Sequence, residues 1–339
     1  MASLLRQYHE VPPGLVDAAP AQLADLLGGP SLIHLPGRRE QPLFLSLLLH
    51  GNETTGFHAL QALLKNYRDR ELPRALSFFI GNVEAARDGL RRLAGQPDYN
   101  RVWPGSDYAD SPEKRMMAEI VDIMRERRPF ASVDIHNNTG INPHYACINR
   151  IDHRFMHLGG LFSRTLVYFI RPAGVQSMAF AELCPSITVE CGKVGQSAGD
   201  QHALEFIDAC LHLSEIPDHP VAAHDIDLFH TVAIVRVPRA YSFGFGGKPA
   251  DICFIDDLDH LNFRELPSGT TLAYVDGIDA LPLEASDEQG VEVGGRYFTL
   301  EDNTVRTSRT LMPSMFTLDE RVIRQDCLGY LMERYPLPA

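Results

Sequence analysis

Residues 42–58, which decide the fold, read PLFLSLLLHGNETTGFH. The apolar run at 43–49 is short and lies between a proline and a glycine, so it predicts a strand buried on both faces. His50 follows the run directly, and Glu53 comes three residues later. Because ligands of open α/β sheets bind beyond the carboxyl ends of the strands, this pair is a candidate for two ligands of a zinc ion.

Strands and helices alternate along the first two thirds of the chain. Apolar runs predict further strands at 31–35, 75–80, 131–135, 145–148, 166–170 and 186–189. Apolar spacing and capping residues predict helices at 20–27, 55–69, 111–127 and 201–213, the last with Asp200 as its cap. This alternation predicts an α/β sheet with helices on both faces.

The pattern of apolar and turn-forming residues changes after residue 216. Residues 216–220 contain two prolines and form a linker, and later runs are β-branched or alternating, with glycine-rich turns between them. These runs lie at 231–237, 270–275 and 291–300. We therefore predict an α/β domain at residues 1–216 and a smaller β-rich domain at residues 221–339.

Composition narrows the class of protein. The formal net charge of the 339 residues is -13, which argues against a nucleic-acid surface. The six cysteines form no Cys-x-x-Cys pair, so we expect reduced thiols and a cytoplasmic protein. Residues 1–13 lack the apolar core of a signal peptide. No apolar run approaches the roughly 18 residues of a membrane span, so we expect no membrane contact.

Two other predicted strands also end in residues that can take part in chemistry. Strand 131–135 ends at His136, which can complete the ligand set of His50 and Glu53. Asp134, two residues earlier, lies on the same side of the strand and can accept the second imidazole N–H. Strand 186–189 ends at Glu190, whose carboxylate can take a proton from zinc-bound water and deliver it to a leaving amine. The pattern predicts metal-dependent hydrolysis.

The connection at residues 82–110 is long and polar, and long loops in compact domains tend to be functional. It carries several arginines and one asparagine near its end: Arg87, Arg91, Arg92, Asn100 and Arg101. Arginine can clamp a substrate carboxylate and can stabilise a developing oxyanion. This loop therefore predicts a substrate that bears a carboxylate.

Four segments in one order resemble the succinylglutamate desuccinylase/aspartoacylase family, a branch of the zinc carboxypeptidase superfamily. They are HGNE at 50–53, DYNR at 98–101, DIHN at 134–137 and ECG at 190–192. The resemblance covers residues 45–215 and continues weakly over 257–277. It implies a central mixed, largely parallel sheet like that of the zinc carboxypeptidases, followed by a small C-terminal β domain. It also implies hydrolysis of an N-acyl amino acid to a carboxylate and a free amino acid.

The resemblance assigns roles by matching position. It implies His50, Glu53 and His136 as the ligands of one zinc ion per chain. It implies Glu190 as the general base and acid, and it makes residues 1–216 the catalytic domain. The partner would be a small N-acyl amino acid or short peptide, and a homodimer is compatible with the sequence.

The resemblance also assigns residues that bind the substrate. It implies Asn100 and Arg101 as the residues that hold the carboxylate of the amino-acid part. Arg92 would polarise the scissile carbonyl, with Arg91 as its competitor. The arginine that binds a second substrate carboxylate in aspartoacylases is replaced by Phe180. We therefore expect a more apolar pocket.

Three alternatives remain open. One is a zinc carboxypeptidase that acts on small peptides, and another is a binding protein without catalysis on the same fold. The third is a serine hydrolase, because residues 195–199 read GQSAG with Ser197 at the centre. A nucleophile elbow needs a sharp turn directly between strand and helix. Five residues separate the predicted strand from Gly195, so we interpret the segment as a glycine-rich loop.

Overall fold

The computed structural model describes residues 4–337 and divides the chain into two compact units. The first unit comprises Met1–Asn137 and His144–Asp227, and the second comprises Asn138–Pro143 and Leu228–Ala339. Residues 138–143 thus group with the C-terminal part of the chain. The predicted domain limits at 216 and 221 stay a prediction, because compactness alone does not show which segments fold independently.

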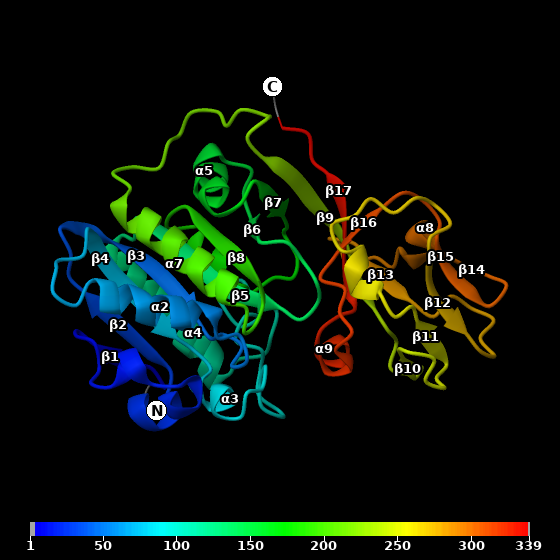
Figure 1. Ribbon diagram of the computed structural model, residues 1–339, viewed down its shortest axis with the longest axis horizontal. Helices are drawn as coiled ribbons and strands as arrows, with labels where there is room; N and C mark the ends of the chain where they lie inside the picture. The colour runs from blue at the N-terminus through cyan, green and yellow to red at the C-terminus, as the bar shows by residue number, and fades with distance from the viewer. Residues whose placement is uncertain (1–3, 338–339) are drawn as a thin grey trace. The chain divides into compact units, whose positions relative to one another are not determined.

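The first unit is built on a mixed sheet (Figure 1). Its strands are β1 (Arg6–Tyr8), β2 (Ser31–Leu35), β3 (Arg39–Leu47), β4 (Arg74–Ile80), β5 (Ala131–Asn138), β6 (Tyr145–Ile148), β7 (Thr165–Tyr168) and β8 (Ser186–Lys193). Their order is β1-β2-β4-β3-β5-β8-β6-β7. Strand β3 runs parallel to both β4 and β5, whereas β2 is antiparallel to β4 and β6 to β8. The predicted mixed sheet is confirmed.

Helices cover both faces of this sheet. On one face lie α2 (Thr55–Asn66), α5 (His153–Phe162) and α7 (Ser197–His212), of which α2 and α7 run side by side (Figure 1). Gly56 permits α2 to pack closely on β3, because a Cβ there would lie 2.9 Å from a methyl carbon of Leu47. On the other face, α4 (Pro112–Arg127) packs its methionines against Phe44 and Phe79.

Shorter helices complete the first unit: α1 (Leu23–Leu27), α3 (Val83–Arg87) and α6 (Gln176–Phe180). The sequence patterns predicted neither α3, α5 nor α6. Helix α7 begins at Ser197 and its N-cap is Gln196, so the prediction of Asp200 as the cap was wrong. The chain reverses earlier than expected because Gly195 adopts a left-handed φ of 82° between β8 and α7.

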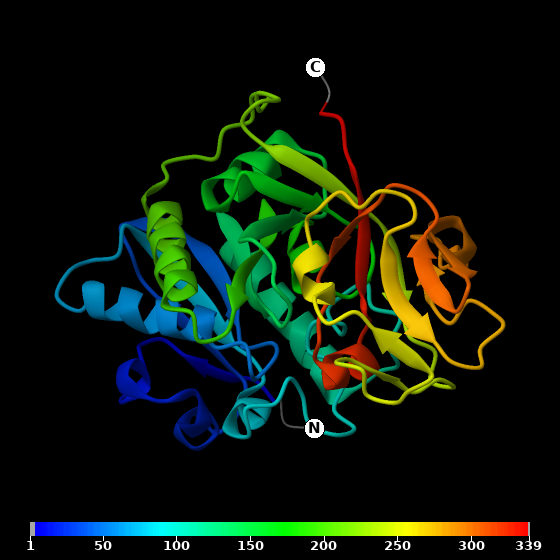
Figure 2. The ribbon, with the colours of Figure 1, turned by 45° about the vertical axis from the view of Figure 1, so that its right-hand side comes forward.

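Among the described residues, the second unit contains two groups of paired strands and two short helices, α8 (Gly294–Tyr297) and α9 (Glu320–Gln325). One group joins β9 (Asp227–Arg236), β17 (Gly329–Arg334) and β16 (Met312–Ser314), with β13 (Glu284–Ser286) paired to β9. The other is a sheet with the order β10-β11-β12-β15-β14; its strands are labelled in Figure 1, and their yellow to orange ribbons are seen from a second side in Figure 2. Its strands are β10 (Phe243–Gly244), β11 (Ile252–Phe254), β12 (Thr271–Val275), β15 (Thr304–Thr307) and β14 (Phe298–Glu301).

The predicted run at 291–300 is only partly a strand. Residues Gly294–Tyr297 form the single turn of α8, because the carboxylate of Glu292 accepts a hydrogen bond from the Gly294 N–H at 2.6 Å. Within residues 4–337, no helix has the length and apolar character needed to cross a membrane. Cytoplasmic location and a homodimer stay predictions.

Candidate metal centre and active site

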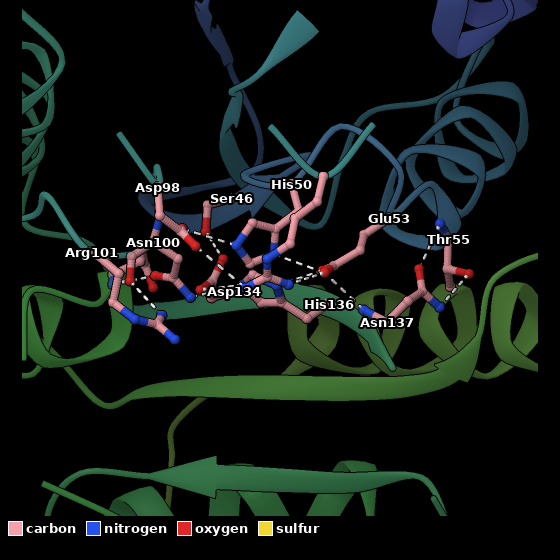
Figure 3. A network of polar contacts seen from close by, with 12 residues as sticks. Ser46, His50, Glu53, Thr55, Asp98, Asn100, Arg101, Asp134, His136 and Asn137 are labelled. Atoms are coloured by element: carbon pink, nitrogen blue, oxygen red, sulfur yellow. Dashed lines mark hydrogen bonds and ion pairs between the residues drawn. The ribbon is translucent and has the colours of Figure 1, made fainter. Parts of the chain in front are cut away.

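Three predicted ligands meet near the carboxyl ends of β3 and β5: His50 and Glu53 follow β3, and His136 lies in the last part of β5. The ligand atoms of His50, Glu53 and His136 all lie within 4.8 Å of one another, and all three residues are buried. One oxygen of Glu53 lies 2.8 Å from His50 Nδ1, and the other lies 2.7 Å from His136 Nδ1 (Figure 3). The two imidazoles therefore present the same kind of nitrogen to one carboxylate.

Local backbone structure explains this convergence. Strands β3 and β5 are parallel neighbours with Ser46 opposite Asp134, so their carboxyl ends reach the same edge of the sheet. After β3 the chain turns sharply, with Leu48 at a φ of 53°. The next turn requires glycine, because a Cβ on Gly51 would lie 2.3 Å from the backbone nitrogen of Ala86. This turn is what carries Glu53 back toward His50.

The Nε2 atom of each imidazole also lies close to a carboxylate. His136 Nε2 lies 2.8 Å from Asp134 Oδ2, as the sequence spacing suggested. His50 Nε2 lies 3.0 Å from Asp98 Oδ1, a partner that the sequence analysis did not assign. In the sequence Asp98 is only the first residue of the DYNR segment, and no spacing rule links a loop aspartate to a histidine 48 residues earlier.

The pKa values follow from these pairs. Burial alone would lower the pKa of His136, but the carboxylates of Asp134 and Glu53 outweigh it and raise the pKa well above its ordinary value. Burial and the Arg91 charge lower the pKa of His50, yet Glu53 and Asp98 leave it raised. Burial would raise the pKa of Glu53, but both imidazoles hold it well below its ordinary value. The centre favours an ionised carboxylate.

These donors fit a zinc ion. Zinc prefers nitrogen and oxygen ligands, and two histidines with one glutamate leave a position open in a catalytic site. Asp98 and Asp134 can each accept the Nε2 proton, so that Nδ1 of His50 and of His136 would be the nitrogens available to a metal ion. The arrangement therefore has both the ligands and the outer carboxylates that such a site requires.

The loop arginines take different positions. Arg91 places Nη1 3.2 Å from Glu53 Oε1 and Nη2 3.4 Å from Asp98 Oδ2. Arg92 instead donates from Nη1 to the backbone carbonyl of Gln96 at 2.7 Å. The geometry therefore favours Arg91 over Arg92 as the arginine of the site, and the earlier choice of Arg92 has no support from it.

Asn100 and Arg101 lie beside the centre (Figure 3). The Asn100 amide nitrogen is 3.1 Å from His136 Nε2, and its oxygen accepts from the backbone N–H of Gln176 at 3.0 Å. Arg101 donates from Nη1 to the Asn100 carbonyl at 2.9 Å. Their role in binding a substrate carboxylate stays a prediction.

Glu190 lies on β8, the next strand after β5 in the sheet. It is buried, and burial raises the pKa of its carboxyl group to about 7, against the opposing influence of the His136 charge. A group with a pKa near neutrality can both accept and return a proton at neutral pH. This property suits the predicted role in acid–base catalysis.

Phe180 does not line a pocket. Its ring is completely buried, stacks on Phe44 at 4.3 Å between centroids and meets Trp103 edge-on. The expectation of a more apolar pocket therefore loses the residue that motivated it and stays untested. The side chain fills the core beneath α4 because its short helix faces the sheet there.

Ser197 is the first residue of α7, and only residues 194–196 separate it from β8. The strand is thus closer to the GQSAG segment than the sequence suggested. No hydrogen bond from a histidine to the Ser197 hydroxyl is found within residues 4–337, so the structure gives the serine hydrolase alternative no base.

The succinylglutamate desuccinylase/aspartoacylase catalytic domain matches residues 41–214, whereas no curated protein matches the chain. Succinylglutamate desuccinylase from Chromobacterium violaceum has 17% identity and a TM-score of 0.55, with 89% of this chain and 87% of that chain covered. A succinylglutamate desuccinylase/aspartoacylase from Rhodobacter sphaeroides has 15% identity and a TM-score of 0.59, with coverages of 89% and 88%. Murine aminoacylase 3 has 13% identity and a TM-score of 0.57, with coverages of 88% and 96%.

The two kinds of comparison carry different weight. At such low identity the solved structures show a shared fold, which agrees with the mixed sheet of the first unit. The matched domain spans more than half of the 339 residues and contains every residue of the candidate centre. The chain belongs to the succinylglutamate desuccinylase/aspartoacylase family and is a hydrolase that acts on C–N bonds.

Proposed function

We propose that this protein is a zinc-dependent deacylase of N-acyl amino acids. The observation that carries the proposal is the convergence of His50, Glu53 and His136 beside a buried Glu190. A bound zinc ion would act as a Lewis acid toward the amide carbonyl and would acidify a water molecule. The similar structures include desuccinylases and an aminoacylase, in agreement with a small acylated amino acid as substrate.

The chain's own residues would then divide the work. Glu190 takes a proton from the attacking water and passes it to the nitrogen of the leaving amino acid. Arg91 replaces Arg92 in our assignment as the donor to the carbonyl oxygen, because its guanidinium lies at the centre. Asn100 and Arg101 hold the carboxylate of the amino-acid part.

The first test is metal analysis of the purified protein together with a panel of N-acyl amino acids and dipeptides. We expect zinc and faster turnover of acyl amino acids than of dipeptides. Preference for dipeptides would instead support the carboxypeptidase alternative. N-acetylaspartate and succinylglutamate belong in the panel beside neutral analogues, since Phe180 gives no reason to exclude a second carboxylate.

The second test is Glu190→Gln, which keeps the shape of the side chain and removes its proton chemistry. Turnover should fall by about 10²- to 10⁴-fold, the usual contribution of a general acid–base group. Zinc content should be unchanged, because Glu190 is not one of the three clustered ligands. Turnover equal to that of the wild type would remove Glu190 from the mechanism.

A further inference from the structure

We infer that Ser46 is a positioning residue for His136 and that it acts through Asp134. Ser46 lies on β3 and is the one polar residue of the apolar run 43–49. It thereby controls the nitrogen that His136 offers to a metal ion. This inference rests on the zinc site of the proposed function. It concerns β3, the strand next to β5, and β3 itself supplies none of the proposed ligands.

The contacts form a short chain across two strands (Figure 3). The Ser46 hydroxyl donates to Asp134 Oδ1, and Asp134 Oδ2 lies 2.8 Å from His136 Nε2. Ser46 and Asp134 are directly opposite each other in the parallel register of β3 and β5. Both are completely buried, with a relative exposure of 0%. The sheet itself therefore sets the distance between hydroxyl and carboxylate.

The serine determines which way the carboxylate faces. The terminal torsion of an aspartate is broad and roughly two-fold, so a single hydrogen bond does not fix the plane of the group. With Oδ1 bound to Ser46, the other oxygen points at His136 Nε2 and holds the proton on that nitrogen. His136 Nδ1, which lies 2.7 Å from Glu53 Oε2, is then the nitrogen that would be available to a metal ion.

Water cannot take over this role as it could at the surface. A buried acceptor that loses its partner is costly, so the carboxylate would rotate to find another donor. That rotation changes its hydrogen bond with His136. The effect of the serine should therefore appear in the imidazole and in metal affinity, as well as in stability.

The decisive variant is Ser46→Ala. Its Zn²⁺ dissociation constant, measured by competition with a chromogenic chelator, should rise by about tenfold, the lower end for groups that orient a metal ligand. In a background of Asp134→Asn the same change should have almost no further effect, because the two residues act in series. The matched control is Ser31→Ala, a completely buried serine on β2 whose hydroxyl donates to the Gly29 carbonyl at 2.9 Å.

A second measurement needs no metal. The proton NMR signal of His136 Nε2–H in the zinc-free protein should move in Ser46→Ala and stay in place in Ser31→Ala. If Ser46→Ala does not fold, Ser46→Cys keeps a weaker donor of similar size and should give a smaller shift in the same direction.

Three outcomes would overturn the inference. The first is a lower melting temperature with unchanged zinc affinity and an unchanged His136 signal, which would make Ser46 purely structural. The second is a loss of zinc affinity that persists in full beside Asp134→Asn. The third is a His136 signal unchanged in every Ser46 variant. A wild-type protein that binds no zinc would instead refute the proposed function, and the NMR signal would still decide on Ser46.

Discussion

The two histidines of the centre are held by different parts of the molecule. His136 is held within the sheet, by Asp134 on its own strand and by Ser46 on the next. His50 is held by the long loop, whose Asp98 lies 3.0 Å from its Nε2. Asp98 in turn accepts from the backbone N–H of Asn100 at 2.8 Å and pairs with Arg91.

The two histidines therefore differ in how rigidly their partners are held. Strand register fixes the support of His136, so its partners cannot move without disturbing the sheet. The support of His50 comes from a connection that also carries the residues proposed to bind substrate. His136 is therefore held by the sheet, whereas His50 is coupled to the loop through Asp98 and Arg91.

The largest expected effect distinguishes two neighbouring loop arginines. Arg91→Gln should lower kcat/KM by about 10²- to 10³-fold, since a donor to a developing oxyanion contributes that much. Arg92→Gln should change it less than about threefold, because the guanidinium donates to the Gln96 carbonyl and away from the centre. Steady-state kinetics at equal zinc content would measure both.

Equal losses in the two arginine variants would mean that the loop acts as one structural unit. A larger loss in Arg92→Gln would return the role to Arg92 and contradict the geometry. Arg91→Lys is the informative intermediate, because it keeps the charge and loses the forked contact with Glu53 and Asp98.

The next effect compares the two outer carboxylates. Asp134→Asn should weaken Zn²⁺ binding by about 100-fold, and Asp98→Asn by about 10-fold, the two ends of the usual range for such groups. The loop can rearrange to offer His50 another acceptor, whereas β5 cannot. Chelator competition on both variants checks the ratio, with circular dichroism to establish that each is folded. A greater loss of zinc affinity in Asp98→Asn than in Asp134→Asn would mean that His50, and not His136, is the more rigidly held histidine.

The same division explains what the sequence could predict. His50, His136 and Glu190 follow apolar runs, and strands of an α/β sheet end at a common edge, so their convergence was readable. Asp134 was readable too, because alternation along a strand is local. Ser46 needed the register between two strands that lie 88 residues apart at the contact, which no local pattern contains.

The loop was harder to read for a different reason. Residues 82–110 have no regular period beyond the short helix α3, so neither Asp98 nor the choice between Arg91 and Arg92 follows from spacing. Phe180 was misread because a substitution at a family position says nothing about burial. Its ring fills the core against Phe44 and Trp103, and only packing reveals that.

The smallest expected effect concerns His34, a buried histidine of the sheet that has no carboxylate partner among the described residues. His34 on β2 is buried, its Nδ1 lies 2.8 Å from the Ser77 hydroxyl, and its Nε2 has no partner within residues 4–337. Burial, together with the charges of Arg127 and His9, lowers its pKa to about 4. A buried imidazole without an acid thus stays neutral, unlike His50 and His136, whose pKa values their carboxylates raise.

This contrast predicts a pH dependence of stability. As the pH falls below the ordinary His pKa of 6.5, the unfolded chain takes up a proton that folded His34 refuses until about pH 4. Stability is therefore present above 6.5 and lost as the pH falls toward 4. Between pH 7.5 and 5.5 the loss from this residue should be about 1 kcal/mol.

His34→Gln should remove that part of the loss in urea unfolding at the two pH values, and Ser31→Ala, on the same strand, should keep it. An identical pH dependence in His34→Gln and the wild type would show that a buried imidazole can be protonated in this sheet without a carboxylate beside it. The carboxylates beside His50 and His136 would then not be needed to stabilise protonated imidazoles.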